Sequence, residues 1–135
     1  MRDALIVDID GTAALGINKH RKAYEYHLCG KDTPNLFVWE LISTWLHKFD
    51  DGIILFLSGR ENVSFPGRSE RKNRSYRKAS FNDKEHKNCY DLTEHWIEYW
   101  SDMLKKEFDW KLFMRAEGDH SPDSIVKYAM YHKYV

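Results

Sequence analysis

Two carboxylates stand two residues apart near the start of the chain, in the run Asp8-Ile9-Asp10-Gly11-Thr12. Residues so spaced on a strand point the same way, and their like charges repel unless a cation lies between them. Mg²⁺ is the usual cation where carboxylate oxygens meet phosphate. One Asp can attack phosphorus to give an aspartyl-phosphate, and the second can protonate the leaving oxygen and later activate water. The run therefore predicts phosphoryl transfer, with Asp8 as nucleophile and Asp10 as proton shuttle.

Polar residues that suit a phosphate group follow later in the chain. Gly11 permits a sharp turn, and Thr12 can bond the turn or the phosphate. Ser58 and Gly59 offer a hydroxyl and backbone N–H groups for a phosphoryl oxygen, and Arg60 offers a planar fork. Each has a simpler interpretation, since Asp-x-Asp-Gly and Ser-Gly both occur in ordinary turns. A lysine such as Lys127 is usually solvated when it lies on a helix.

Three strand–helix pairs are predicted to position these residues. Short apolar runs predict buried strands over residues 4–9, 53–57 and 111–115. Helices are expected from Pro34-Asn35 to about residue 49, from a capping box at Asp91 to about residue 104, and from Ser121-Pro122 onward. Residues 11–33 and 61–90 are expected to be loops. The inward-facing positions expected on the helices are Phe37, Val38, Leu41, Ile42, Trp45, Leu46 and Phe49, then Leu92, Trp96, Trp100, Met103 and Leu104, then Ile125, Val126, Ala129 and Met130.

This alternation of strands and helices predicts an α/β fold with a parallel sheet. Ligands in such sheets bind beyond the carboxyl ends of the strands. Asp8, Ser58 and Arg115 all fall at those ends, so we expect them to converge. At 135 residues, the chain is expected to form a single domain over residues 1–135.

Composition narrows the class of protein. The formal net charge is zero, so the protein as a whole has no net electrostatic attraction to nucleic acid. Between Arg60 and Lys87, however, nine Lys/Arg face four Asp/Glu. This basic insertion at about 61–90 is either a solvated loop or a lid or substrate loop that guides a phosphate-bearing ligand. The sequence shows no apolar run of ~20 residues and no signal peptide, and its two cysteines fit a reduced, cytoplasmic protein.

Taken together, these motifs resemble the haloacid dehalogenase (HAD) superfamily. The match is carried by Asp8-Ile9-Asp10-Gly11-Thr12, by Leu57-Ser58-Gly59-Arg60 and by Lys127. It is closer still to the 3′-phosphatase domain of phage-type polynucleotide kinase/phosphatase. The residues that carry this closer match are Arg21 and Tyr24, Asp32-Thr33-Pro34-Asn35, Arg115, Gly118-Asp119, Asp123 and Lys127.

The resemblance implies a HAD-like Rossmannoid three-layer sandwich and a role for each motif. Asp8 would be the nucleophile and a Mg²⁺ ligand, and Asp10 the general acid and base, with its backbone carbonyl on the metal. Ser58 would bind the transferring phosphoryl group, and Lys127, oriented by Asp123, would neutralise the aspartyl-phosphate. The other residues expected to hold substrate phosphate or shape the site are Thr12, Arg21, Gly59, Arg60 and Arg115. The substrate would be a 3′-phosphate on a nucleic-acid end or a nucleotide.

One departure from the family pattern leaves alternatives open. The acidic pair of the fourth HAD motif, expected on a strand beside residues 4–9, is not found before Val135, so the fold is expected to stop after the third strand–helix unit. The domain could therefore be a weak or inactive relative that binds nucleic acid or a protein, or half of a split enzyme completed by a partner chain or a second copy. No membrane association is expected.

A zinc site is the weakest of the interpretations. His86 and Cys89 stand three residues apart, but the chain holds no paired-cysteine motif. The Trp96 and Trp100 side chains could stack on bases, yet their helical spacing favours packing in the core.

Overall fold

A parallel three-stranded sheet forms the centre of the computed structural model, which describes residues 2–65, 79–104 and 107–134. Its strands are β1 (Ala4–Asp8), β4 (Ile53–Glu61) and β7 (Asp109–Arg115), arranged in the order β1-β4-β7. Their in-register pairing aligns Asp8 with Leu57 and Phe113 with Leu57. The three carboxyl ends therefore lie at one edge, as the sequence predicts.

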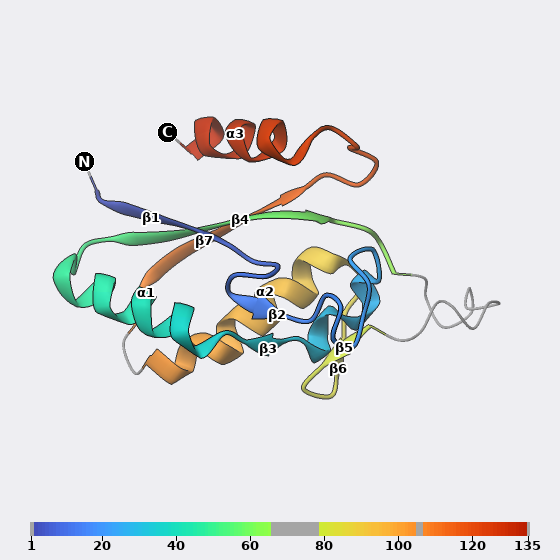
Figure 1. Ribbon diagram of the computed structural model, residues 1–135, viewed down its shortest axis with the longest axis horizontal. Helices are drawn as coiled ribbons and strands as arrows, with labels where there is room; N and C mark the ends of the chain where they lie inside the picture. The colour runs from blue at the N-terminus through green and yellow to red at the C-terminus, as the bar shows by residue number, and fades with distance from the viewer. Residues whose placement is uncertain (1, 66–78, 105–106, 135) are drawn as a thin grey trace.

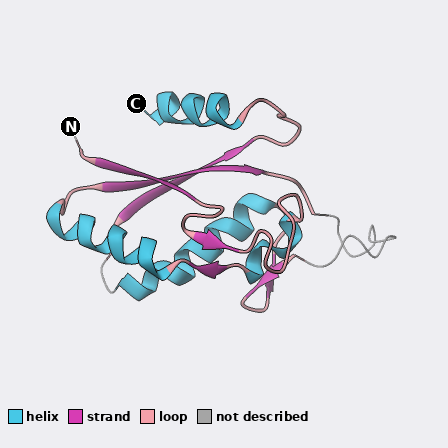
Figure 2. Cartoon of the chain, in the orientation of Figure 1, coloured by secondary structure: helices cyan, strands magenta, loops and turns pink. Residues whose placement is uncertain are grey.

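Three helices cover both faces of the sheet, giving three layers (Figures 1 and 2). The helices are α1 (Leu36–Lys48), α2 (Cys89–Ser101) and α3 (Asp123–Tyr134). α1 and α2 lie on one face, and α3 lies alone on the other (Figure 1). The larger core fills the α1/α2 side, where Trp39, Trp96 and Phe56 pack together, and the smaller one joins Val126 and Met130 to the sheet. This arrangement confirms the predicted α/β fold class.

Short elements occupy both segments that were expected to be loops. Residues 11–33 contain β2 (Ala14–Leu15) and the 3-10 helix η1 (Tyr26–Lys31), and β2 pairs with β3 (Thr33–Pro34). The β5 (Ser80–Phe81) and β6 (Lys84–Glu85) strands form a hairpin, and a 3-10 turn, η3 (Asp102–Leu104), follows α2. Most of the basic residues expected in the insertion, from Arg68 to Lys78, lie outside the described residues.

The helices α1 and α2 begin at other residues than predicted, because strand pairing at Pro34 and a side-chain cap at Asn88 determine where they start. Pro34 belongs to β3 and not to the first turn of α1, whose N-cap is Asn35. The cap of α2 is Asn88, whose side-chain oxygen accepts a hydrogen bond from the Asp91 N–H at 2.8 Å. The predicted capping box at Asp91 is therefore wrong.

Several expected inward positions on the helices are also wrong. Phe37 and Leu41 are 68% and 52% exposed on α1, whereas Trp39 is buried. Met103, Ile125 and Ala129 are exposed as well. The buried face of α1 consists instead of Trp39, Ile42 and Leu46, and the Trp39 indole N–H donates to the Ala13 carbonyl at 3.0 Å. The single stripe drawn from apolar residues alone could not place this bond.

The outer edge of β1 is open, because within the described residues β1 pairs only with β4. Ile6 on this strand is 49% exposed. No helix among the described residues is both long and apolar enough to cross a membrane.

Candidate phosphoryl-transfer site

The turn after β1 fixes the two candidate catalytic carboxylates. Gly11 has φ +78°, a left-handed conformation that favours glycine. The N–H groups of Ala13 and Ala14 donate to the carbonyls of Asp8 and Ile9 at 3.3 and 2.9 Å. The Ala13 carbonyl in turn accepts from the Asn35 N–H at 3.0 Å, which ties the turn to the start of α1. Asp8 therefore ends the strand, and Asp10 lies within a tightly bonded turn.

Lys127, on helix α3, contacts Asp8 directly. Its Nζ lies 2.6 Å from Asp8 Oδ1 and 3.0 Å from Asp123 Oδ2, one turn earlier on α3. Burial acts to lower the pKa of Lys127, but its bonds to Asp8 and Asp123 outweigh this and raise the pKa. The ammonium is therefore held charged beside Asp8, which suits neutralisation of negative charge on that side chain.

Asp123 is held in turn from β4 and β7. Arg115 Nη2 lies 3.4 Å from Asp123 Oδ1, and Arg115 Nε donates to the Gly59 carbonyl at 3.0 Å. A Cβ added at Gly59 would collide with the Asp123 carboxylate. Glycine at this position therefore makes room for the acid that orients Lys127.

A second cluster surrounds Asp10. Its Oδ1 accepts from Arg21 Nη2 and from Arg60 Nη2, both at 2.8 Å. Both arginines also bind Asp32, with Nη2–Oδ2 distances of 2.8 Å from Arg21 and 2.9 Å from Arg60. Arg60 Nη1 donates to Thr93 Oγ1 at 3.0 Å. The two guanidinium groups thus join Asp10, which is partly exposed, to Asp32, which is fully buried.

This cluster controls the protonation of Asp10. Burial acts to raise the pKa of the Asp10 carboxyl, but the adjacent Arg60 and Arg21 outweigh it and hold the pKa below the ordinary value of 3.8. In this geometry the two arginines favour the ionised form of Asp10. Asp8, by contrast, is 38% exposed and contacts a single ammonium group. The two neighbouring carboxylates thus have different environments.

The structure brings together the residues singled out from the sequence, but it places three of them behind the surface. The Arg21 and Arg60 side chains are 0% and 1% exposed and bind carboxylates, so they shape the site from below. Ser58 is buried within β4, and its hydroxyl accepts from the Arg60 N–H at 3.0 Å. Thr12 lies closer to the surface, with Oγ1 3.5 Å from Asp8 Oδ2. Arg115 is largely engaged by backbone carbonyls.

Asp32, Thr93 and His20 also belong to this network, although no sequence motif assigns them a role. Asp32 was noted only within the stretch before Pro34, and His20 Nε2 lies 3.0 Å from its Oδ1. No spacing rule pairs Asp32 with Arg60, which is 28 residues away. The signal that was available is chemical, because two buried arginines require buried acids.

The oxygen donors present suit a magnesium ion only in part. Among the described residues, Asp8 Oδ2 makes only a long 3.5 Å contact with Thr12 Oγ1, so this oxygen remains available as a ligand. Within residues 2–65, 79–104 and 107–134, no group of three or more acidic, histidine or cysteine side chains could hold a metal. Mg²⁺ commonly uses one or two carboxylates and completes its shell with water and phosphate. The Asp8 carboxylate and the Asp10 backbone carbonyl are oxygen donors of the kind that such a Mg²⁺ site uses.

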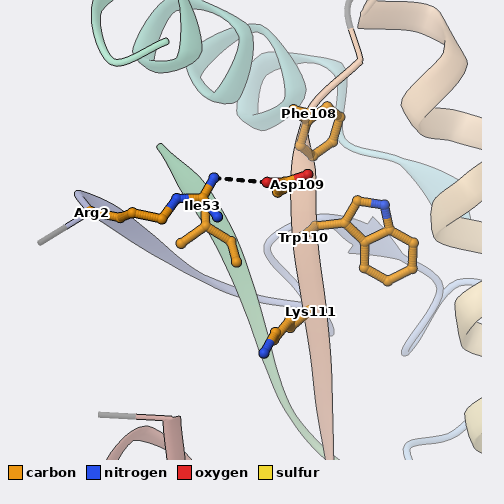
Figure 3. Close-up of a pocket in the computed structure, with 6 residues that line it drawn as sticks. All are labelled: Arg2, Ile53, Phe108, Asp109, Trp110 and Lys111. Atoms are coloured by element: carbon orange, nitrogen blue, oxygen red, sulfur yellow. Dashed lines mark hydrogen bonds and ion pairs between the residues drawn. The ribbon is translucent and has the colours of Figure 1, made fainter. Parts of the chain in front are cut away.

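A cavity elsewhere in the structure lies away from this site. One cavity of about 360 Å³ lies at the amino ends of the strands, where Arg2 bonds Asp109 at 2.9 Å beside Trp110 and Lys111 (Figure 3). The amino ends lie opposite the carboxyl ends that carry Asp8 and Arg115. This cavity is therefore separate from the candidate phosphoryl-transfer site.

Comparison with known families decides the identity of the domain. The family model described as the polynucleotide kinase PNKP phosphatase domain matches residues 2–135. The chain belongs to the PNKP phosphatase-domain family. The sequence resemblance to polynucleotide kinase/phosphatase is thereby confirmed. The region that carries Asp8, Lys127 and the arginine cluster is the region matched by the PNKP family model.

Individual relatives of this PNKP-family domain are larger proteins. A putative bifunctional polynucleotide kinase/RNA ligase of Autographa californica nuclear polyhedrosis virus is 27% identical over 133 residues, covering 98% of this chain and 15% of that protein. A chain in the structure of the Pnkp1/Rnl/Hen1 complex has a TM-score of 0.62 and 18% identity, covering 99% of this chain and 35% of that one. A chain in the Pnkp1/Rnl/Hen1 RNA repair complex gives 0.63 and 20%, covering 99% and 32%. These structures support the HAD-like fold.

Proposed function

We propose that this domain is a Mg²⁺-dependent phosphatase that removes a 3′-phosphate from nucleic-acid ends or nucleotides. The observation that carries the proposal is the 2.6 Å contact between Lys127 and Asp8 at the carboxyl end of β1. Membership of the PNKP phosphatase family supports a phosphatase that acts on nucleic-acid ends. The bound metal would supply positive charge for the phosphoryl oxygens.

The first proposed step transfers the phosphoryl group to Asp8. A carboxylate oxygen of Asp8 attacks phosphorus, and the bond from phosphorus to the 3′-oxygen breaks. Asp10 gives its proton to that leaving oxygen, so the product is a free 3′-hydroxyl. Lys127 lies on the other Asp8 oxygen and offsets negative charge during the transfer. This step needs Asp10 in its protonated form, whereas the adjacent Arg60 and Arg21 lower the pKa of Asp10 in the structure without substrate.

The second proposed step releases inorganic phosphate. Water attacks the phosphorus of the aspartyl-phosphate, and the acyl-phosphate bond to Asp8 breaks. Asp10, now a carboxylate, takes the proton of the attacking water and returns to its starting state. Its contacts with Arg21 and Arg60 favour that carboxylate form. The arrangement seen in the structure therefore matches the second half of the cycle.

The test is phosphate release from a 3′-phosphorylated oligonucleotide, compared with the same oligonucleotide carrying a 5′-phosphate. Activity should require added Mg²⁺ and should disappear with Asp8→Asn. A trapped acid-stable, base-labile phosphoprotein that forms with the native chain but not with Asp8→Asn would support the aspartyl-phosphate. Turnover that persists unchanged in Asp8→Asn would sink the proposal.

A second candidate function follows from the open edge of β1. Few carboxylates surround Asp8 among the described residues, and Ile6 beside it is 49% exposed. We propose that a strand carrying acidic residues, from a partner chain or a second copy, can pair with β1 and complete the site. Without it the domain binds nucleic-acid ends weakly and turns over slowly. Light scattering with activity measured across protein concentrations separates the cases, because a monomer with concentration-independent, full turnover would contradict this proposal.

A further inference from the structure

A groove follows the free edge of the sheet on the side opposite to β1. It has a volume of about 350 Å³ and lies between α2 and β7. Tyr90, Glu94 and Glu98 form its α2 wall. Trp110, Leu112 and Phe113 contribute the β7 side. The proposed phosphoryl-transfer chemistry uses none of these residues.

The strand that borders this groove has an unpaired edge in the described part of the chain, where β7 pairs only with β4. An edge strand leaves a row of backbone N–H and C=O groups that can accept another strand. Among the described residues, a weak contact covers part of this edge. The Tyr90 hydroxyl donates to the Leu112 carbonyl at 3.4 Å, longer than the roughly 2.5–3.0 Å of a good O–H···O bond. An incoming peptide N–H could replace it at little cost.

The α2 residues that line the groove include two carboxylates and no basic side chain. Glu94 and Glu98 stand one turn apart on α2, and across the described residues neither carboxylate has a hydrogen bond or ion pair. The groove's lysine, Lys111, points to the ring of Tyr134, with Nζ 5.3 Å from its centroid. Burial, then Glu98 and Asp91, raises the pKa of Glu94. Bringing a cation to this wall would therefore relieve a repulsion already present.

We infer that the edge of β7 is a docking site for an extended polypeptide with alternating apolar and basic side chains. Its backbone would add a strand to the sheet beside β7. Its basic side chains would meet Glu94 and Glu98 on the α2 face of the sheet, and its apolar ones, on the opposite face, would pack on Phe113. A strand of six residues spans roughly 20 Å, which matches the seven residues of β7 (Asp109–Arg115). This inference does not depend on phosphatase activity.

The probe is a fluorescein-labelled hexapeptide that alternates lysine and valine, with a glutamate–valine hexapeptide as its matched control. Fluorescence anisotropy at low ionic strength should show binding of the basic peptide only, and added salt should weaken it. Double charge reversal, E94K with E98K, should lower the affinity about tenfold or more. The same change at an exposed position of α1, Glu40→Lys, should leave the affinity within about twofold.

Peptide variants test the strand pairing without altering the protein. N-methylation on alternate residues blocks one edge of the peptide, and methylation on the other residues blocks the opposite edge. One methylated set should lose roughly tenfold in affinity, because it removes the backbone hydrogen bonds to β7, and the other should lose little. Equal affinity for both sets and for the unmodified peptide would overturn the inference. So would equal binding of the acidic peptide, or absence of basic-peptide binding at low salt.

Discussion

Lys127 Nζ lies 2.6 Å from Asp8 Oδ1, although the two residues are 119 positions apart in the chain. Asp8 is the last residue of β1 in the central sheet. Lys127 lies in the first half of α3, the helix that covers one face of this sheet. Asp123 holds the same ammonium at 3.0 Å, and Gly59 leaves room for Asp123. The end of β1, helix α3 and Gly59 on β4 thus all help to place Lys127 beside the Asp8 carboxylate. The predictions below test this arrangement and the arginine cluster beneath it.

Asp8→Asn should abolish phosphate release, lowering the rate by at least about a thousandfold, because the amide is a poor nucleophile. The fold should persist, since Asp8 is partly exposed and its contact is with a surface-accessible lysine. The rate is measured with a 3′-phosphorylated oligonucleotide, and circular dichroism checks the fold. Asp51→Asn, at an exposed position just before the amino end of β4 and so at the opposite edge of the sheet from Asp8, is the matched control and should retain native activity.

Gly59→Ala should reduce turnover by about ten- to a hundredfold, because the added methyl group displaces Asp123 and so loosens Lys127. A double-mutant cycle with Asp123→Ala gives the decisive comparison. Once the Asp123 carboxylate is gone, the Gly59 substitution should cost little more. Additive losses in the cycle would mean that Gly59 acts through some other contact.

Asp32→Asn should lower the free energy of unfolding by about 3–5 kcal/mol, because it leaves two buried guanidinium groups with one fewer carboxylate. Urea denaturation measures the change. Asp83→Asn is the control, since Asp83 is exposed and its φ of +63° suits asparagine equally well. An Asp32 variant as stable as the control would show that the buried cluster does not stabilise the fold.

The stability of the domain should fall in acid partly through Asp10. Its folded-state pKa lies below the ordinary 3.8, so above 3.8 the carboxylate contributes stability in full. As the pH falls below 3.8, the unfolded chain takes up the proton first, and this stability is lost as the pH passes through the folded-state pKa. Urea denaturation from about pH 6 to about pH 3 should show a smaller acid loss in Asp10→Asn than in the native chain. Parallel curves would contradict the assignment.

The sequence by itself determined the fold class and the family. Apolar runs before Asp8, within residues 53–57 and before Arg115 predict parallel strands, and their carboxyl ends do meet. The order of motifs predicted the family that the comparison then showed. These features are local or ordered along the chain, which is why pattern alone reveals them.

Only the tertiary structure decided how each charged group is used. Arg60 looks like a phosphate ligand in sequence, yet its guanidinium group is buried between Asp10 and Asp32. Phe37 and Leu41 fit a helical stripe, yet Trp39 packs inward, and its indole N–H bonds Ala13. Ion pairs and buried hydrogen bonds join residues far apart in the chain. Their partners are set by three-dimensional distance and desolvation, and no residue spacing encodes these.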